Sequence, residues 1–174
     1  MKTVLGIDLG TQSLKLVFYD YRTRRVAAAA SAPLDLHQDD HGAAEQQADW
    51  WLTALHAALR EVGDDVRRSV QAIAVSGQQH GFVPVAASGK VLAPVKLWCD
   101  TSTVAECDEI MAAYGGPQKC LDEVGNLILP GYTASKIRWL AKADPQTYGR
   151  MRTILLPHDY LNFYLTGERS MEAG

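Results

Sequence analysis

Apolar residues gather in three short runs near the start of the chain and predict three strands. The runs cover Thr3 to Asp8, Leu14 to Tyr19 and Val26 to Ala32, and short apolar runs separated by turn residues are typical of strands. Short connections between such strands favour an antiparallel meander. We expect the polar segment from Pro33 to Gln47 to be a surface loop.

The pattern changes to helical spacing at Asp49, where we expect a helix with this residue as its N-cap. Apolar side chains then recur at helical spacing as far as Gly63, at Trp51, Leu55, Ala58, Leu59 and Val62. Val70 to Val75 has the length of a strand, and a strand that follows a crossover helix pairs most naturally in parallel. The pattern therefore predicts a mixed α/β fold.

The second half of the chain predicts one hairpin and several helices. Phe82 to Val85 and Val91 to Trp98 flank a turn at residues 87–90, and we expect them to form the hairpin. Helices are expected at Thr103 to Tyr114, Thr133 to Ala143 and His158 to Leu165.

Composition narrows the class of protein. The 174 residues are 47 % hydrophobic, which is enough for one good core, so a single domain is expected. The 17 basic and 20 acidic residues are mixed along the chain and disfavour nucleic-acid and membrane partners. Three irregularly spaced cysteines make neither a disulfide framework nor a zinc site, which favours a cytoplasmic protein.

The first candidate site lies in residues 6–13, with the sequence Gly-Ile-Asp-Leu-Gly-Thr-Gln-Ser. Asp8 ends an apolar strand and can hold Mg²⁺, while the amides and hydroxyls that follow it suit phosphate oxygens. A Walker-type P-loop is disfavoured because the Gly-Lys-Ser/Thr ending is absent and a second strand follows. An ordinary hairpin turn remains the alternative. Lys15 on the second strand can reach a phosphate or be simply solvated.

Two further groups of polar residues follow predicted strands, at residues 76–81 and 98–102. In open α/β sheets, ligands bind beyond the carboxyl ends of the strands. Gln79 and His80 can exchange hydrogen bonds with hydroxyl groups, and Trp98 can offer an apolar face to sugar C–H groups. The alternatives are that the side chains after the strand satisfy backbone groups of a turn, and that Asp100 is only a helix N-cap.

Four segments, at residues 6–11, 76–81, 97–100 and 156–161, together resemble the N-terminal region of the sugar kinases that include glycerol kinase and xylulokinase. Gln79-His80-Gly81 is similar to the sugar-contacting site of the xylulokinase subgroup, and residues 126–127 and 130–136 are similar to its middle segment. The resemblance covers nearly the whole chain. It implies an actin/hexokinase-like (ribonuclease H-like) mixed sheet flanked by helices.

The resemblance implies ATP-dependent phosphorylation of D-xylulose to D-xylulose 5-phosphate, with ATP and Mg²⁺. By position, Asp8 would organise the Mg²⁺ and phosphate end. Sugar binding would fall to Gln79, His80, Trp98 and Asp100, and phosphate binding to Thr11, Gln12, Ser13 and Lys15. Many relatives carry Arg two residues after the Asp that matches Asp100, whereas this chain has Ser102. This departure weakens the transfer of a substrate contact to Asp100.

The family's general base is an Asp in a Gly-Gly-Asp-Asn type motif, and these 174 residues contain no such motif. We therefore expect residues 1–174 to be the sugar-binding N-terminal part of a longer kinase, without its C-terminal nucleotide-binding domain. Such an incomplete domain should leave an apolar face uncovered. The alternatives are a catalytically inactive binding module and a kinase of another polyol, such as glycerol or ribulose. The sequence leaves open whether the full-length form is a homodimer.

Overall fold

The computed structural model describes residues 1–171, and the chain divides into two compact units. The first unit contains Met1–Leu36, Gln47–Gln79 and the residues from Pro157 onward. The second contains His37–Gln46 and His80–Leu156. The length of the chain favoured a single core, but two segments of the chain leave the first unit and build a second one.

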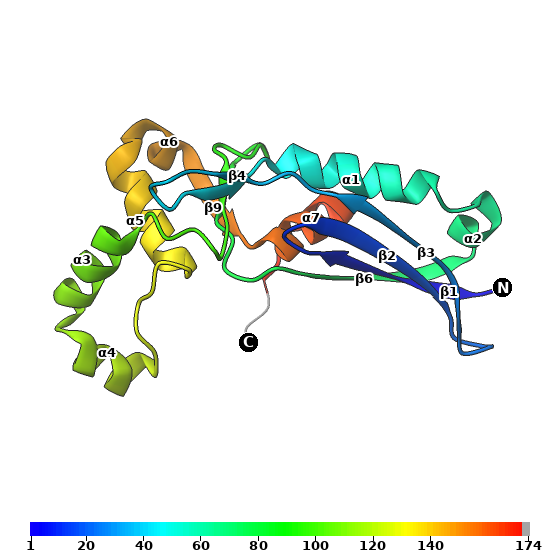
Figure 1. Cartoon of the computed structure of the whole chain (residues 1–174), viewed down its shortest axis with the longest axis horizontal. Coiled ribbons are helices and arrows are strands. Elements are labelled where there is room, and N and C mark those ends of the chain that lie inside the picture. The colour runs from blue at the N-terminus through cyan, green and yellow to red at the C-terminus, as the bar shows by residue number, and fades with distance from the viewer. Residues whose placement is uncertain (172–174) are drawn as a thin grey trace. The chain divides into compact units, whose positions relative to one another are not determined.

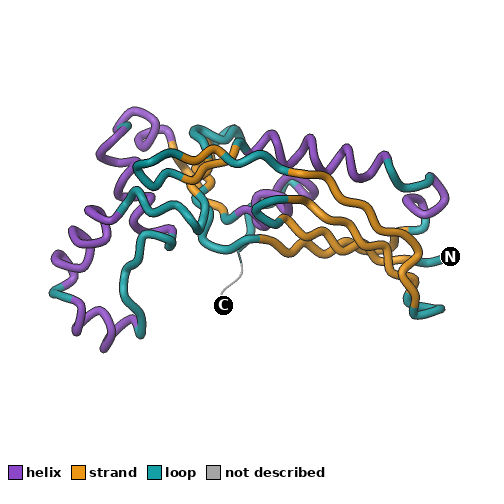
Figure 2. The backbone as a smooth tube through the Cα atoms, viewed as in Figure 1, coloured by secondary structure: helices purple, strands orange, loops and turns teal. Residues whose placement is uncertain are grey.

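The first unit is built on a four-stranded sheet with the order β3-β2-β1-β6 (Figures 1 and 2). Its strands are β1 (Thr3–Leu9), β2 (Ser13–Asp20), β3 (Arg25–Pro33) and β6 (Val70–Gly77). The first three strands form an antiparallel meander, and β6 pairs with β1 in parallel. Both features confirm the predictions from the hydrophobic pattern.

One face of this sheet carries the core of the first unit. Alternate side chains of β1 and β2 are buried on it, namely Leu5, Ile7, Leu9, Leu14, Leu16 and Phe18. Helix α1 (Ala48–Arg60) packs against β2 and β3, and α7 (Pro157–Thr166) packs against β6. The two helices meet through Trp51 and Tyr160, whose rings lie edge to face with centroids 6.0 Å apart. A short helix, α2 (Asp64–Arg68), precedes β6.

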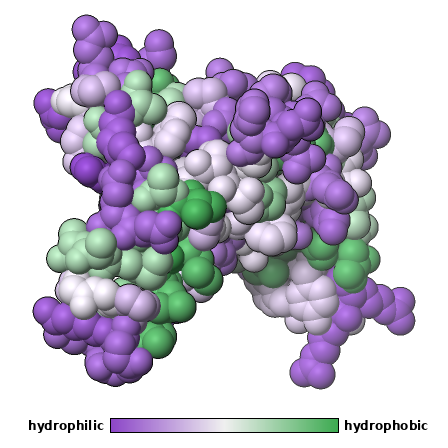
Figure 3. Space-filling model, turned by 60° about the vertical axis from the view of Figure 1, so that its left-hand side comes forward, coloured by the Kyte–Doolittle hydropathy of each residue, from purple (hydrophilic) through white to green (hydrophobic). Residues whose placement is uncertain are grey.

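The opposite face of the sheet exposes apolar side chains. Val17, Tyr19 and Val26 are all exposed, and Tyr19 and Val26 are partners in the β2–β3 register. Alternation along a strand sends successive side chains to opposite faces, so the buried set on one face fixes this exposed set on the other. Apolar side chains also reach the surface that is drawn in Figure 3, among hydrophilic ones. This face of the sheet therefore carries exposed apolar side chains, and the expectation of an uncovered core face stays a prediction.

The second unit combines two small sheets with four helices. The first sheet has the order β4-β5-β8, and in the second β7 pairs with β9. These strands are β4 (His37–Gln38), β5 (Ala44–Gln46), β7 (Val83–Ala86), β8 (Val95–Lys96) and β9 (Met151–Leu155). The helices are α3 (Val104–Tyr114), α4 (Pro117–Val124), α5 (Thr133–Ala143) and α6 (Pro145–Arg150). Helix α5 packs against α3 and α6.

Two local predictions were wrong, and a third was correct only in part. The segment from Pro33 to Gln47 contains β4 and β5, which are too short for a two-residue period to be visible. Gln47 is the N-cap of α1, and Asp49 lies in its first turn, where a carboxylate is favoured by the helix dipole. The expected hairpin is present only in part: its two arms pair through antiparallel bridges, such as Val85 with Val91, while the regular ladders of β7 and β8 are made with β9 and β5.

Candidate functional site

The turn between β1 and β2 is the tip of a β-hairpin, as the sequence predicted, and it is closely folded. The backbone N–H of Gly10 donates to the carbonyl of Ser13 over 3.1 Å, and the carbonyl of Gln12 accepts from Leu34 over 2.9 Å. A Cβ atom on Gly10 would lie only 3.1 Å from the Ser13 carbonyl oxygen. The glycine therefore lets the turn close and leaves the hydroxyls of Thr11 and Ser13 beside it.

Gln78, directly after β6, ties this turn to the end of the parallel strand. Its backbone N–H donates to the Leu9 carbonyl over 2.8 Å. Its side-chain Nε2 lies 3.5 Å from the Gly10 carbonyl oxygen, and its Oε1 accepts from Thr11 Oγ1 over 3.3 Å. The alternative interpretation, that a polar side chain after this strand satisfies backbone groups of a turn, is therefore confirmed for Gln78.

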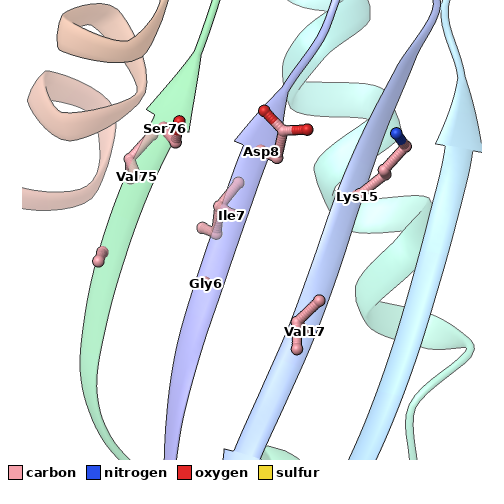
Figure 4. A pocket seen from close by; sticks show the side chains of 8 residues that line it. Gly6, Ile7, Asp8, Lys15, Val17, Val75 and Ser76 are labelled. Atoms are coloured by element: carbon pink, nitrogen blue, oxygen red, sulfur yellow. The ribbon is translucent and has the colours of Figure 1, made fainter. Parts of the chain in front are cut away.

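Asp8 lies at the edge of a shallow depression on the exposed face of the sheet (Figure 4). The depression has a volume of about 340 Å³ and is lined by Gly6, Ile7, Asp8, Lys15, Val17, Ala74, Val75 and Ser76. Lys15 and Ser76 are the register partners of Asp8 on β2 and β6. A carboxylate, an ammonium and a hydroxyl therefore stand on three adjacent strands, and all three residues are exposed.

The chemistry of this group fits a metal ion that is shared with a phosphate ligand. Mg²⁺ usually keeps several waters and is held by one or two carboxylates together with phosphate oxygens. Asp8 supplies one exposed carboxylate, and the hydroxyls and amides of the hairpin turn follow it directly. Among residues 1–171 there is no cluster of three or more His, Cys, Asp and Glu side chains that could hold a metal by themselves.

His80 opens the second unit, where the chain passes out of the first unit after Gln79. Its φ of +62° lies in the left-handed region, which non-glycine residues rarely adopt. The imidazole lies against the Tyr132 ring, with centroids 4.7 Å apart. Partial burial and the charge of Lys136 lower the pKa of His80. The ring is therefore neutral near pH 7 and can both donate and accept a hydrogen bond.

Trp98 keeps a large exposed surface, since 51 % of the residue is accessible. Its backbone carbonyl lies against Gly131, where a Cβ atom would come within 2.7 Å of the oxygen. The residue is thus half exposed, while its backbone is closely packed.

Asp100 is fully buried, and protein donors occupy both of its carboxylate oxygens. One oxygen accepts from the Ala44 N–H over 3.0 Å and from Lys96 Nζ over 3.1 Å. The other accepts from the Ser102 backbone N–H over 3.0 Å and from its hydroxyl over 2.6 Å. Asp100 therefore holds the framework of the second unit. The N-cap interpretation is wrong, because Thr103 is the N-cap of α3, and a substrate contact stays a prediction.

Lys96 is a buried cation that sequence reasoning missed. Its ammonium lies 2.9 Å from Glu45 Oε1, 3.1 Å from Asp100 and 2.9 Å from Ser102 Oγ. It also lies 4.2 Å from the centroid of the Trp139 ring, within cation–π range. A buried charge is tolerated when it is paired and hydrogen-bonded. The only sequence signal was a lysine four positions before an aspartate.

The fold and the site define a class of protein. A three-stranded meander extended by a parallel strand, with helices on one face and an acidic hairpin turn, is the actin/hexokinase-like sheet of a carbohydrate kinase N-terminal domain. Residues 3–174 match the model of the FGGY family of carbohydrate kinases, N-terminal domain, and the chain belongs to this family.

Several xylulose kinases are similar to this chain over nearly its whole length. The enzyme of Haemophilus influenzae is 37 % identical over 177 residues, which cover 98 % of this chain and 36 % of that protein. The enzyme of Streptomyces coelicolor is 33 % identical over 171 residues, with 98 % and 35 % covered. The chain thus spans about a third of the length of the curated relatives it matches.

Solved structures agree with this assignment. The structure of a xyloylose kinase from Brucella ovis is 34 % identical with a TM-score of 0.86, and it covers 95 % of this chain and 34 % of its own. A xylulose kinase from Rhodospirillum rubrum is 29 % identical with a TM-score of 0.87, and the match covers 97 % and 35 %. The fold class predicted from the sequence is therefore confirmed. Within the described residues, no helix is both long and apolar enough to cross a membrane.

Proposed function

We propose that this chain carries the sugar-binding and phosphate-orienting part of an ATP-dependent xylulose kinase, which converts D-xylulose to D-xylulose 5-phosphate. The observation that carries the proposal is the similarity to xylulose kinases at 33–37 % identity over 96–98 % of the chain. The four motifs of the sequence all lie within residues 3–174, which match the family model. The reaction would take place in the cytoplasm.

Phosphoryl transfer depends on in-line positioning and charge neutralisation more than on covalent chemistry. In the proposed role, Asp8 holds a Mg²⁺ ion together with phosphate oxygens, and the ion neutralises their charge. The hydroxyls and amides of Thr11, Gln12 and Ser13 hydrogen-bond the phosphate groups, and Lys15 adds a positive charge nearby. These residues all belong to the first unit.

The sugar is bound in the proposed function by Gln79, His80 and Trp98. The amide and the neutral imidazole exchange hydrogen bonds with sugar hydroxyls, and the exposed indole covers the C–H groups. A general base must come within hydrogen-bond reach of the hydroxyl that it deprotonates. Asp8 is proposed to hold the metal ion, so we expect a different carboxylate to act as the general base.

Sugar binding can be tested on the 174-residue chain by NMR titration of backbone amide and indole signals. We expect D-xylulose to shift the signals of His80 and Trp98 at lower concentrations than glycerol or ribulose. Tighter binding of glycerol would favour a kinase of another polyol. If none of the three compounds shifted these signals, the proposed sugar site would be refuted.

Turnover provides a second test. We expect no D-xylulose-dependent consumption of ATP by the 174-residue chain in a coupled assay, because the proposed general base lies outside it. Measurable turnover would show that one of its own carboxylates deprotonates the sugar.

A further inference from the structure

We propose that Lys136 is the positioning residue for His80, and that its buried ammonium fixes the chain path that presents the imidazole to the sugar. The inference rests on the proposed sugar-binding role of His80. No motif assigned a task to Lys136, which lies in the first turns of α5.

Lys136 is buried in an unusual way for a lysine. The residue is 0 % exposed, and its Nζ donates to the carbonyl oxygens of His80 over 2.9 Å and Gly131 over 2.8 Å. Burying an ammonium is costly unless hydrogen bonds satisfy it, and holding a long side chain in one rotamer costs conformational entropy. Both named acceptors are backbone atoms, so the ammonium fixes the course of two chain segments.

The first of these segments needs such support. His80 has a φ of +62°, a conformation that costs energy for a residue with a Cβ atom and persists where the surroundings hold it. Its carbonyl accepts a second hydrogen bond from Thr133 Oγ1 over 3.2 Å, and its ring lies 4.7 Å from the Tyr132 ring. Three residues at the start of α5 therefore hold the backbone and the ring of His80.

The second segment leads to Trp98. Gly131 accepts the other hydrogen bond of the ammonium, and its Cα faces the Trp98 carbonyl so closely that a Cβ atom would lie 2.7 Å from the oxygen. Lys136 thus links the backbone of His80 with the segment that packs against the backbone of Trp98. Both residues belong to the proposed sugar site and to the second unit.

The charge of Lys136 has a second consequence. Together with partial burial, it lowers the pKa of His80 and keeps the imidazole neutral. The groups that act on the ammonium itself are Asp100, Cys99, Lys96 and Cys107. Removing the charge should therefore raise the pKa of His80, an effect that a purely space-filling residue would not produce.

Lys136→Met in the 174-residue chain tests the proposal, with Lys142→Met as the matched control. Lys142 lies on the same helix, keeps part of its side chain exposed, and is paired with the buried Glu106 and the partly exposed Glu109. In Lys136→Met we expect the NMR titration of the His80 ring to move to higher pH and the affinity for D-xylulose to fall about tenfold, the order of one lost charged hydrogen bond. The control should leave the His80 titration unmoved and the affinity within about twofold.

A third variant separates the hydrogen bonds from the charge. Lys136→Gln keeps N–H donors without the charge, so we expect it to recover part of the sugar affinity while the pKa of His80 stays raised. If Lys136→Met does not fold, this variant and Thr133→Val, which removes the other donor to the His80 carbonyl, carry the test.

Unchanged sugar affinity and an unchanged His80 titration in the folded Lys136 variants would overturn the proposal. If the wild-type chain binds no sugar, the proposed function fails, and the His80 titration alone then decides whether Lys136 controls this residue. The two failures are therefore distinguishable.

Discussion

The burial of Lys136 predicts that the stability of the chain rises with pH in the alkaline range. Desolvation lowers the pKa of this lysine from 10.5 to about 8 in the folded protein, whereas the unfolded chain regains the ordinary value. Between these two values the unfolded state binds more protons than the folded state. The free energy of unfolding therefore increases with pH between about 8 and 10.5, and the variant Lys136→Met should lack this increase.

The magnitude follows from the two pKa values. Their separation corresponds to about 3 kcal/mol, of which about 2 kcal/mol accumulates between pH 7 and pH 9.5. Burial raises the pKa of Cys99 and Cys107, so these thiols contribute stability that is lost as the pH rises through their folded pKa values. This effect of burial is common to the wild type and the variant, so the difference between the two reports Lys136 together with its own lowering effect on the two thiol pKa values.

Urea denaturation at the two pH values, followed by circular dichroism and tryptophan fluorescence, measures this difference. On going from pH 7 to pH 9.5, we expect the wild type to gain about 2 kcal/mol relative to Lys136→Met. For the control Lys142→Met the difference should stay constant, because Glu106 and Glu109 raise the pKa of Lys142 and keep it charged over this range. Parallel pH profiles of the wild type and Lys136→Met would refute the reasoning.

Three further predictions concern the buried contacts of the second unit and the proposed phosphate site at Asp8. Asp100→Asn removes the carboxylate beside the buried Lys96 and should lower the free energy of unfolding by about 3 kcal/mol in urea denaturation, and a loss below about 1 kcal/mol would contradict the framework role. Gly131→Ala places a Cβ atom 2.7 Å from the Trp98 carbonyl oxygen and should cost about 2 kcal/mol, whereas Gly149→Ala, with nothing within 4 Å, should cost none. In the full-length kinase, Asp8→Asn should weaken Mg²⁺-dependent ATP binding about tenfold in calorimetry and leave D-xylulose binding unchanged, and an equal loss of both would contradict a separate phosphate end.

The first unit was predictable because its signals are local. The short apolar runs of β1, β2 and β3 and the short turns between them predicted the meander, and the crossover through α1 predicted the parallel pairing of β6. The second unit was not predictable in the same way. Val83 of β7 pairs with Leu155 of β9, far along the chain, and strands of two to five residues gain their partners from tertiary contacts and carry little pattern of their own.

The candidate site shows the same division between local and tertiary information. Glycine, carboxylate and hydroxyl in one turn, or glutamine and histidine after a strand, mark possible chemistry in the sequence itself. Lys96 and Lys136 carry no such mark, because most lysines are exposed and only the fold shows that these two are buried.

Ser102 acquires a different meaning once the surroundings of Asp100 are known. From the sequence, a serine where many relatives carry arginine weakened the case for Asp100 as a substrate contact. In the structure, the Ser102 hydroxyl donates to Asp100 and accepts from Lys96, so the serine connects the carboxylate to a cation that comes from β8. The positive partner of Asp100 is thus present but enters from another element. An arginine at 102 would bring a second cation beside Lys96, so serine and lysine form one compatible arrangement, and the contacts of Asp100 within the chain hold the framework of the second unit.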